Sequence, residues 1–433
     1  MKYIDKLKFF QKQSKNDVFK NMAILAMGVG GAQVISLALT PVLTRIYTPE
    51  DFGILAIFMA VVGIVSPFST LRYSVPIPLL NKDGIAINLF ALATCILLFL
   101  TILVIVILSF YVDEIFEIFS IGNLVSYWWL IPIMIFVSGS YEILNAWSIR
   151  QKYFKAISKS NVLKTLSSSL VKIFLGVLGV KPMGLLVGAI FANIYGTVFL
   201  AKSNFQSIKE NIRYITKKRI LFLAQRYAEY PKYRLPSQFI LVLSQQAPLL
   251  FLATFFGANV VGYFGLTMMV LSVPLALFGS TTGQAYYAEI AKIGRKDPTK
   301  IYEVTQDVIK KLFLLSLIPF LILLIGSPIL FNTIFGDAWY ESGVYASIMS
   351  FYMLTAFVSA PLANALSVFE DQLMFLKLNI IRLILLIVLF SISWIIHLSA
   401  IETIFLYSMS MSGYFIYLSY YILKTIKEKK RDH

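Results

Sequence analysis

The sequence predicts an all-α polytopic membrane protein of about 12 transmembrane helices, arranged as two pseudo-symmetric six-helix lobes around a central cavity. Of the 433 residues, 58% are hydrophobic and only 14% are charged, and the mean hydropathy is +0.78, well above the range of soluble domains. Apolar stretches of roughly twenty residues recur along the chain, and each is long enough to cross a hydrocarbon core about 30 Å thick. The two halves also carry short matching motifs in the same order.

The apolar runs and the polar segments between them set the expected spans. These spans are 21–44, 52–73, 85–110, 124–147, 161–179, 184–201, 236–256, 260–285, 308–326, 343–367, 374–394 and 399–423. The long polar segment after the sixth span contains nine Lys and Arg residues and divides the helices six and six. The expected organisation is a cytoplasmic amino-terminal tail 1–20, an N-lobe 21–201, a basic interlobe linker 202–235, a C-lobe 236–423 and a basic tail 424–433.

The distribution of positive charge predicts a bacterial inner-membrane protein with both termini in the cytoplasm. In that orientation, only Arg45 and Lys181 among the 38 Lys and Arg residues lie in outer loops, and cytoplasmic loops are the ones enriched in these residues. The outer loops instead hold the acidic residues Glu50, Asp51, Asp113, Glu114, Glu117, Asp337, Glu341 and Glu402. The net charge of +16 then faces anionic lipid headgroups, and no nucleic-acid partner is needed. The apolar residues of the linker would also suit a helix on the membrane surface, although a plain linker is the simpler interpretation.

Redox and metal chemistry have few candidate residues. Cys95 is the single cysteine, so no intramolecular disulfide can form. The two histidines, His397 and His433, are far apart in sequence and belong to no cluster with ligand spacing. We therefore expect no metal site and no cofactor, apart from a coupling H⁺ or Na⁺.

Internal similarity supports a duplication, and transporter sites often lie where such repeats meet. The segment 145–149 (NAWSI) resembles 364–368 (NALSV), and 161–164 (NVLK) resembles 379–382 (NIIR) at nearly the same offset. The series Pro41, Gly53 and Pro67 likewise corresponds to Pro248, Gly262 and Pro274. These correspondences predict two lobes whose helices run in the same orientation.

Charged residues inside spans are the main site candidates, because a charge at the centre of a membrane helix costs about 2.5 to 3.5 kcal/mol. Lys172 lies roughly 17 Å along its predicted helix, too deep to reach the surface easily. It ends a stripe of polar residues at three- and four-residue steps: Asn161, Lys164, Thr165, Ser168 and Lys172. This stripe predicts a helix face that lines an aqueous cavity.

The second lobe offers Asn379 and Arg382 at the repeat-related position, so each lobe is expected to supply a cation to one central anion site. Phosphate suits this pair, because guanidinium binds it bidentately and ammonium adds a compact charge. A purely structural alternative stays open, in which Lys164 reaches the surface and Lys172 or Arg382 pairs with Glu142 or with the acidic corner 370–371. Glu142 itself is either such a salt-bridge partner or the carrier of a coupling proton.

Further polar residues are candidates for the cavity lining. They are Gln33, Ser36 and Thr40 in the first span, Gln245 and Gln246 in the seventh, and Ser280, Thr281 and Gln284 in the eighth. Each of them serves interhelical packing equally well, because small and amide side chains commonly join membrane helices.

The sequence resembles bacterial polysaccharide flippases of the Wzx (O-antigen) type, in the multidrug/oligosaccharidyl-lipid/polysaccharide exporter superfamily. The resemblance rests on residues 32–33 (AQ), 41–53 (PVLTRIYTPEDFG), 71–73 (LRY), 230–231 (YP), 246–248 (QAP), 262–264 (GYF), 335–339 (FGDAW) and Gly343. Arg45 and Arg72 match motif positions of this family near opposite ends of the first two helices. The similarity covers nearly the whole chain.

The resemblance implies an alternating-access flippase that moves undecaprenyl-pyrophosphate-linked oligosaccharide units to the outer leaflet for O-antigen, capsule or exopolysaccharide synthesis. Membrane lipids, a polysaccharide polymerase and a chain-length regulator are the expected partners. A drug antiporter of the same superfamily is the main alternative, although it would favour acidic residues in the cavity. A polytopic glycan polymerase or ligase is less consistent with the sequence, which shows no large polar loop and no acidic cluster at one face.

Overall fold

The computed structural model describes residues 2–118, 122–275, 280–293, 297–362 and 372–431, and the regular structure in these ranges is entirely helical. The first half contains α1 (Lys2–Ile46), α2 (Pro49–Val65), α3 (Asp83–Ile118), α4 (Leu130–Arg150), α5 (Phe154–Val177), α6 (Met183–Asn211) and the short α7 (Lys217–Arg226). The second half contains α8 (Leu235–Pro274), α9 (Ser280–Ile293), α10 (Pro298–Phe335), α11 (Tyr340–Ile348), α12 (Ser350–Leu362), α14 (Gln372–Ile395) and α15 (Ala400–Arg431).

The helices account for the predicted number of membrane crossings. Within the described ranges, eight helices are long and apolar enough to span a membrane, and the bent pair α11 and α12 makes a ninth span. Gly257, with a φ of +79°, breaks α8 into two limbs and so adds one crossing. The helices α5 and α15 are more polar, but at 24 and 32 residues they are also long enough to cross the bilayer, which brings the count among the described residues to twelve. The prediction of about 12 membrane helices is therefore confirmed.

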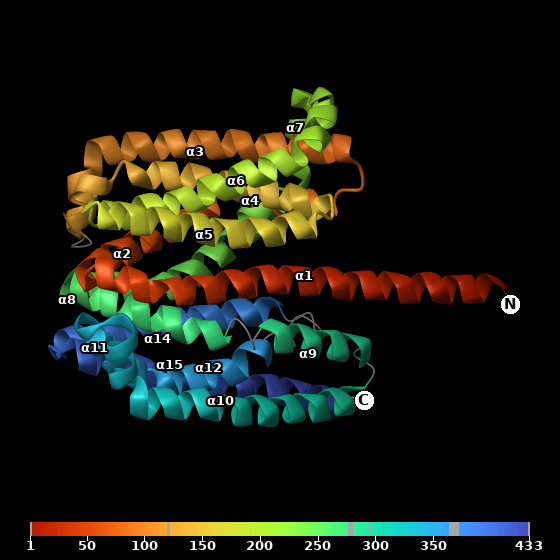
Figure 1. Cartoon of the computed structure of the whole chain (residues 1–433). Coiled ribbons are helices and arrows are strands. Elements are labelled where there is room, and N and C mark those ends of the chain that lie inside the picture. Colours follow the sequence, from red (N-terminus) through yellow and green to blue (C-terminus); the bar gives the residue numbers. More distant parts are fainter. Residues whose placement is uncertain (1, 119–121, 276–279, 294–296, 363–371, 432–433) are drawn as a thin grey trace.

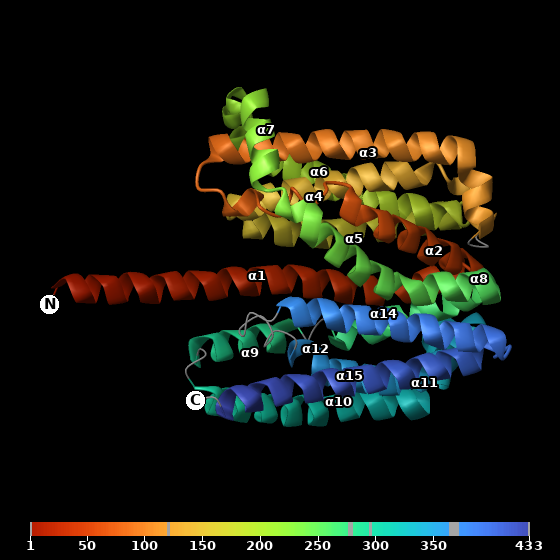
Figure 2. The same cartoon turned by 180° about the vertical axis from the view of Figure 1, so that it is seen from behind.

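Two helical bundles make up the molecule, and both figures show them with α1 running between them (Figures 1 and 2). One bundle contains α3 to α6 and the other α9 to α15, whereas α8 starts beside the first bundle and runs obliquely to the far end (Figure 2). The two bundles agree with the predicted two lobes. The start of α1, the end of α15 and α7 all lie at one end, which we call the basic end. We call the opposite end, where α2, α8 and α11 meet, the far end. The exact lobe boundaries stay a prediction.

Two helix ends differ from the sequence expectation. The segment 1–20 was expected to be a tail before the first helix, but α1 is already helical from Lys2. The second span was expected to reach residue 73, but α2 ends at Val65 and a 3₁₀ turn through Pro67 follows. The chain then adopts positive φ values at Leu71 and Arg72 (+44° and +62°), which no helix can include. The sequence of this turn, SPFSTLRY, contains Pro67 and four polar residues, a signal of a helix end that the span prediction passed over.

Local capping explains where α2 begins. The side chain of Thr48 accepts a hydrogen bond from the backbone N–H of Asp51 at 3.3 Å, and the Asp51 carboxylate accepts one from the Thr48 N–H at 2.9 Å. This reciprocal pair is a capping box, which satisfies amide groups that a helix start otherwise leaves unpaired. Pro49 adds a φ suited to the first helical position. The cap fixes the sharp turn between α1 and α2 at the far end.

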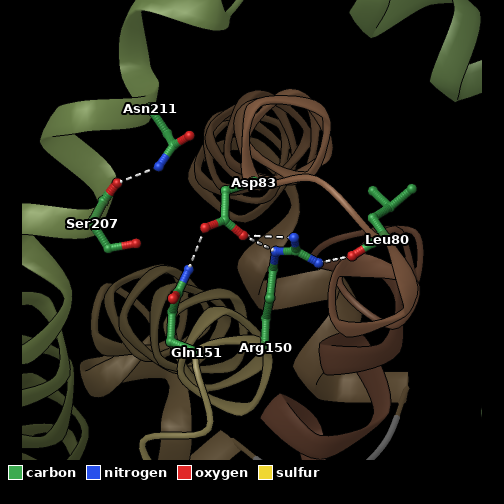
Figure 3. A network of polar contacts seen from close by, with 6 residues as sticks. All are labelled: Leu80, Asp83, Arg150, Gln151, Ser207 and Asn211. Carbon is green, nitrogen blue, oxygen red and sulfur yellow. Dashed lines mark hydrogen bonds and ion pairs between the residues drawn. The ribbon is translucent and has the colours of Figure 1, made fainter.

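At the basic end of the N-lobe, a polar network ties α3 to α4 (Figure 3). The Arg150 guanidinium contacts a carboxylate oxygen of Asp83 through both Nε and Nη2, each at 2.6 Å, and also donates to the carbonyl oxygen of Leu80. Gln151 donates to the second Asp83 oxygen at 3.2 Å. Because the Arg150 side chain is only 8% exposed, this pair is better protected from solvent than a typical surface ion pair.

Candidate functional site

A cavity of about 330 Å³ lies between α1, α2, α5, α6 and the second limb of α8. It therefore touches both lobes, although most of its wall belongs to the N-lobe. Its polar lining consists of Ser36, Thr40, Lys164, Thr165, Ser168, Ser169 and Lys172. No acidic residue is among the described residues that line it, so the electrostatic potential of the cavity favours an anion.

Helix α5 directs the polar stripe predicted from its sequence into this cavity. Lys164, Ser168 and Lys172 all line it, although α5 begins at Phe154, earlier than expected. Lys172 makes no ion pair or side-chain hydrogen bond with any residue that the structure describes. An ammonium group in this setting retains its capacity to bind an anion.

Lys164 is positioned by neutral groups. Its Nζ donates to Asn193 Oδ1 of α6 at 2.8 Å and lies 3.7 Å from the centre of the Tyr141 ring, in the geometry of a cation–π contact. Tyr141 in turn donates its hydroxyl hydrogen to Asn161 Oδ1 at 2.9 Å. Among the described residues no acidic side chain pairs with Lys164, and its side chain is held on the same face of α5 as Lys172, about two helical turns away.

Helix α6 makes room for both lysines through small residues at every fourth position, namely Gly184, Gly188, Ala192 and Gly196. A Cβ atom on Gly188 would come within 2.4 Å of Lys172 Cγ, and one on Gly196 within 2.6 Å of Lys164 Cδ. The aliphatic stems of the lysines thus lie along a groove of α6. Sequence reasoning missed this groove and Asn193, although the four-residue spacing of small residues is a recognisable signal of close helix packing.

Arg382 and Asn379 lie in α14 and do not line this cavity. Arg382 instead lies within electrostatic range of the phenols of Tyr352, Tyr407 and Tyr414, which come from α12 and α15, and its Nε atom is buried without a hydrogen-bond partner in the described structure. Asn379 is buried in the same lobe. The structure therefore brings Lys164 and Lys172 together, whereas Arg382 faces the interior of the C-lobe.

Arg72 lies in the turn that follows α2, near the basic end. Its Nη1 is 3.6 Å from Glu142 Oε1 of α4, and the same oxygen accepts a hydrogen bond from Ser74 at 2.5 Å. The Nε atom of Arg72 is buried without a hydrogen-bond partner in the described structure. Glu142 thus pairs with Arg72, and the pairing with Lys172 considered from the sequence is not formed.

At the far end, Arg45 joins the two lobes. Its Nη1 donates to the carbonyl oxygen of Ile334 in α10 at 3.1 Å, and Trp339 Nε1 donates to the carbonyl oxygen of Thr44 at 3.0 Å. The Trp339 ring is fully buried and packs edge-on against Phe52 at 4.9 Å. Arg45 therefore lies outside the cavity, in contacts that hold this end together.

The glutamine candidates occupy several places. Gln33 Nε2 donates to Ser272 Oγ of α8 at 3.0 Å and so bridges the lobes. Gln246 lies against Gly63 of α2, and Gln245 is exposed on α8. Gln284 belongs to α9, but its side chain lies outside the described residues. Among the residues that the structure describes, no group of three or more His, Cys, Asp or Glu side chains could hold a metal ion.

Comparisons with known proteins identify a family for this chain and solved structures with a similar fold. Residues 42–344 match the family described as polysaccharide biosynthesis protein. The fold is similar to an inward-facing multidrug resistance MATE family transporter of the MOP superfamily, with a TM-score of 0.67 at 14% identity over 94% of this chain and 99% of that one. It is also similar to the lipid II flippase MurJ in an inward closed conformation, with a TM-score of 0.68 at 13% identity over 94% and 87% of the two chains. A search of curated proteins found no match.

Proposed function

Because the chain belongs to the polysaccharide biosynthesis protein family and has the fold of MOP superfamily transporters, we propose that it flips undecaprenyl-pyrophosphate-linked oligosaccharides across the bacterial inner membrane. The transported units would serve O-antigen, capsule or exopolysaccharide synthesis. In this proposal, both termini and the basic end face the cytoplasm. A polysaccharide polymerase and a chain-length regulator would act on the product.

The observation that carries the proposal is that Lys164 and Lys172 line one cavity whose described lining includes no acidic residue. A pyrophosphate carries its charge on oxygens that accept charge-assisted hydrogen bonds from ammonium groups. Lys172 supplies a donor without a competing partner among the described residues, and Ser168 supplies a neutral hydroxyl one turn away. The remaining lining, which includes Ser36 and Thr40 of α1, would border the attached glycan.

Alternating access gives the pyrophosphate a route across the membrane. The lobes are joined at the far end through Trp339 and Arg45, so the site would load from the basic end and release after these contacts separate. Arg382 would act within the C-lobe rather than at the pyrophosphate. Coupling to H⁺ or Na⁺ belongs to the same proposal, with Glu142 as the candidate carboxylate.

Flipping of a fluorescent polyprenyl-pyrophosphate disaccharide in proteoliposomes tests this function. Loss of one charge-assisted hydrogen bond, about 1.5 to 3 kcal/mol, corresponds to a roughly ten- to hundredfold loss, so Lys172→Gln should lower flipping to that extent while Lys172→Arg retains more. The exposed Lys310→Gln serves as the matched control and should be unaffected.

A cationic dye carried in the same vesicles examines the drug-antiporter alternative. An anionic cavity would be required for such cargo, and this cavity presents ammonium groups instead. The proposal would be overturned if the protein transported the dye but did not flip the glycolipid, and if Lys172→Gln increased the transport of the dye.

A further inference from the structure

Helix α7 is a short basic helix that lies outside the bundle of spans. In both views it stands across the direction of α3 to α6 at the basic end (Figures 1 and 2). The spans cross the bilayer, so a helix perpendicular to them runs parallel to the membrane plane. Its position at the end of α3 places it at the depth of the lipid headgroups.

The protein holds α7 in this position through its inner face. Leu223 is only 2% exposed and packs in a core with residues of α3 and α4. The amide of buried Asn88 donates to the Tyr214 carbonyl oxygen at 3.2 Å and accepts from the Thr216 N–H at 2.9 Å, just before α7 begins. Tyr73 donates to the Ala224 carbonyl oxygen at 2.9 Å. The helix is thus a fixed part of the N-lobe.

The outer face of α7 combines apolar and basic side chains. Leu221 and Phe222 are 62% and 58% exposed, although they are large hydrophobic residues. Lys217, Lys218, Arg219 and Arg226 are exposed around them. The segment 211–228 contains no acidic residue, so its cations lack a counter-ion within their own stretch of chain.

The cations at 217–219 do not stabilise the helix that carries them. They occupy its first turn, where the helix dipole is positive and adjacent like charges repel one another. An external anion would offset both effects. The exposed leucine and phenylalanine lie next to these cations, so a matching ligand must offer an apolar region beside an anionic one. A membrane surface has this arrangement.

We propose that the outer face of α7, formed by Lys217, Lys218, Arg219, Leu221, Phe222 and Arg226, is a docking surface for anionic phospholipid headgroups. Leu221 and Phe222 enter the acyl boundary while the cations bind lipid phosphates. The surface is separate from the cavity that contains Lys172, and its occupant is a lipid of the bilayer rather than the transported substrate.

The test uses the full chain with an environment-sensitive fluorophore attached at position 225, through the substitution Gln225→Cys in a Cys95→Ala background. The protein is reconstituted in phosphatidylcholine vesicles that contain 0 to 40% phosphatidylglycerol, and headgroup-spin-labelled phosphatidylglycerol is the quencher. We expect quenching to rise at least threefold over the amount seen with spin-labelled phosphatidylcholine. The triple change of residues 217–219 to Gln should abolish this preference, and added salt should weaken it.

The matched control removes three cations elsewhere at the basic end, by changing Lys300, Lys310 and Lys311 of α10 to Gln. The lipid preference at position 225 should survive this change. Equal quenching by the two spin-labelled lipids in the native sequence would overturn the proposal. It would also be overturned if the control variant lost the lipid preference as completely as the triple change at 217–219. A fluorophore that stays in water in every lipid mixture would also overturn the proposal, because the face would then not contact the membrane. None of these readouts depends on transport, so they remain informative if the proposed flippase activity fails.

Discussion

Gly53 of α2 and Gly262 of α8, which occupy corresponding positions in the two halves of the sequence, each pack against the backbone of the other's helix. A Cβ atom on Gly53 would lie 1.8 Å from the Ala258 carbonyl oxygen, and one on Gly262 would lie 1.8 Å from the Pro49 carbonyl oxygen. The contact is thus nearly symmetric between the lobes. It allows their backbones to meet at the far end, as small residues do in membrane helix pairs.

This contact predicts that Gly53→Ala weakens the far end. Its methyl group would meet backbone atoms, which cannot turn aside as a side chain can, and overpacking of this kind costs about 1 to 3 kcal/mol. The free energy of unfolding in detergent, measured by thermal or steric-trapping methods, should fall by that amount. Gly265→Ala is the matched control, because its Cβ would lie 3.5 Å from the Ala56 Cβ, an ordinary contact. Equal effects of the two changes would contradict this explanation.

Trp339 predicts a second effect at the far end. Trp339→Phe removes the hydrogen bond to the Thr44 carbonyl oxygen but keeps an aromatic ring near Phe52. A buried carbonyl that loses its donor costs about 1 to 3 kcal/mol, so the contact between the lobes should open more often. Hydrogen exchange of the amides at 44–48 should accelerate by at least fivefold, while exchange in α14 stays unchanged. Unaltered exchange at 44–48 would show that the hydrogen bond does not hold this end.

Gly188 predicts a link between α6 and the binding site. The Gly188→Ala methyl group would displace the flexible side chain of Lys172 and also approach the Ser168 carbonyl oxygen at 3.1 Å. We expect the apparent affinity of the anionic substrate to fall about tenfold, with little loss of folded protein. Gly326→Ala, whose Cβ would meet only the Leu330 side chain at 3.5 Å, should leave the affinity unchanged. An equal loss in both variants would rule out displacement of Lys172.

Variants of Arg72 and Glu142 test whether the Glu142 carboxylate has a structural role or carries the coupling proton. Both side chains are partly exposed and 3.6 Å apart, so a double-mutant cycle of Arg72→Gln and Glu142→Gln should give a coupling energy of only about 0.5 to 1 kcal/mol in stability. If Glu142 only supports the turn after α2, flipping under an imposed pH gradient will respond equally in the native protein and in Glu142→Gln. Loss of that response in the variant alone would assign the coupling proton to Glu142.

The sequence predicted the parts of the site that lie on one helix. Lys164, Ser168 and Lys172 repeat at helical spacing inside an apolar run, so their shared face follows from local geometry. The direction of Arg382 could not be predicted, because the tyrosines around it come from α12 and α15 and are brought together only by packing. The end of α2 was missed although residues 66–73 (SPFSTLRY) include Pro67 and four polar residues, which signal a break in the span. The left-handed backbone angles of Leu71 and Arg72 leave no trace in hydropathy.

Arg150 provides the sharpest test of the polar network at the basic end (Figure 3). Its guanidinium contacts Asp83 through two nitrogens and reaches the Leu80 carbonyl oxygen with a third, which no ammonium group can reproduce from one position. Arg150→Lys should therefore lower the free energy of unfolding by about 1 to 3 kcal/mol, although the charge is kept. The control is Lys311→Arg, since Lys311 forms an exposed pair with Asp307 at 2.7 Å that contributes at most about 0.5 kcal/mol. If Arg150→Lys proved as neutral as that control, charge alone would hold α3 to α4, and the forked geometry would have no energetic role.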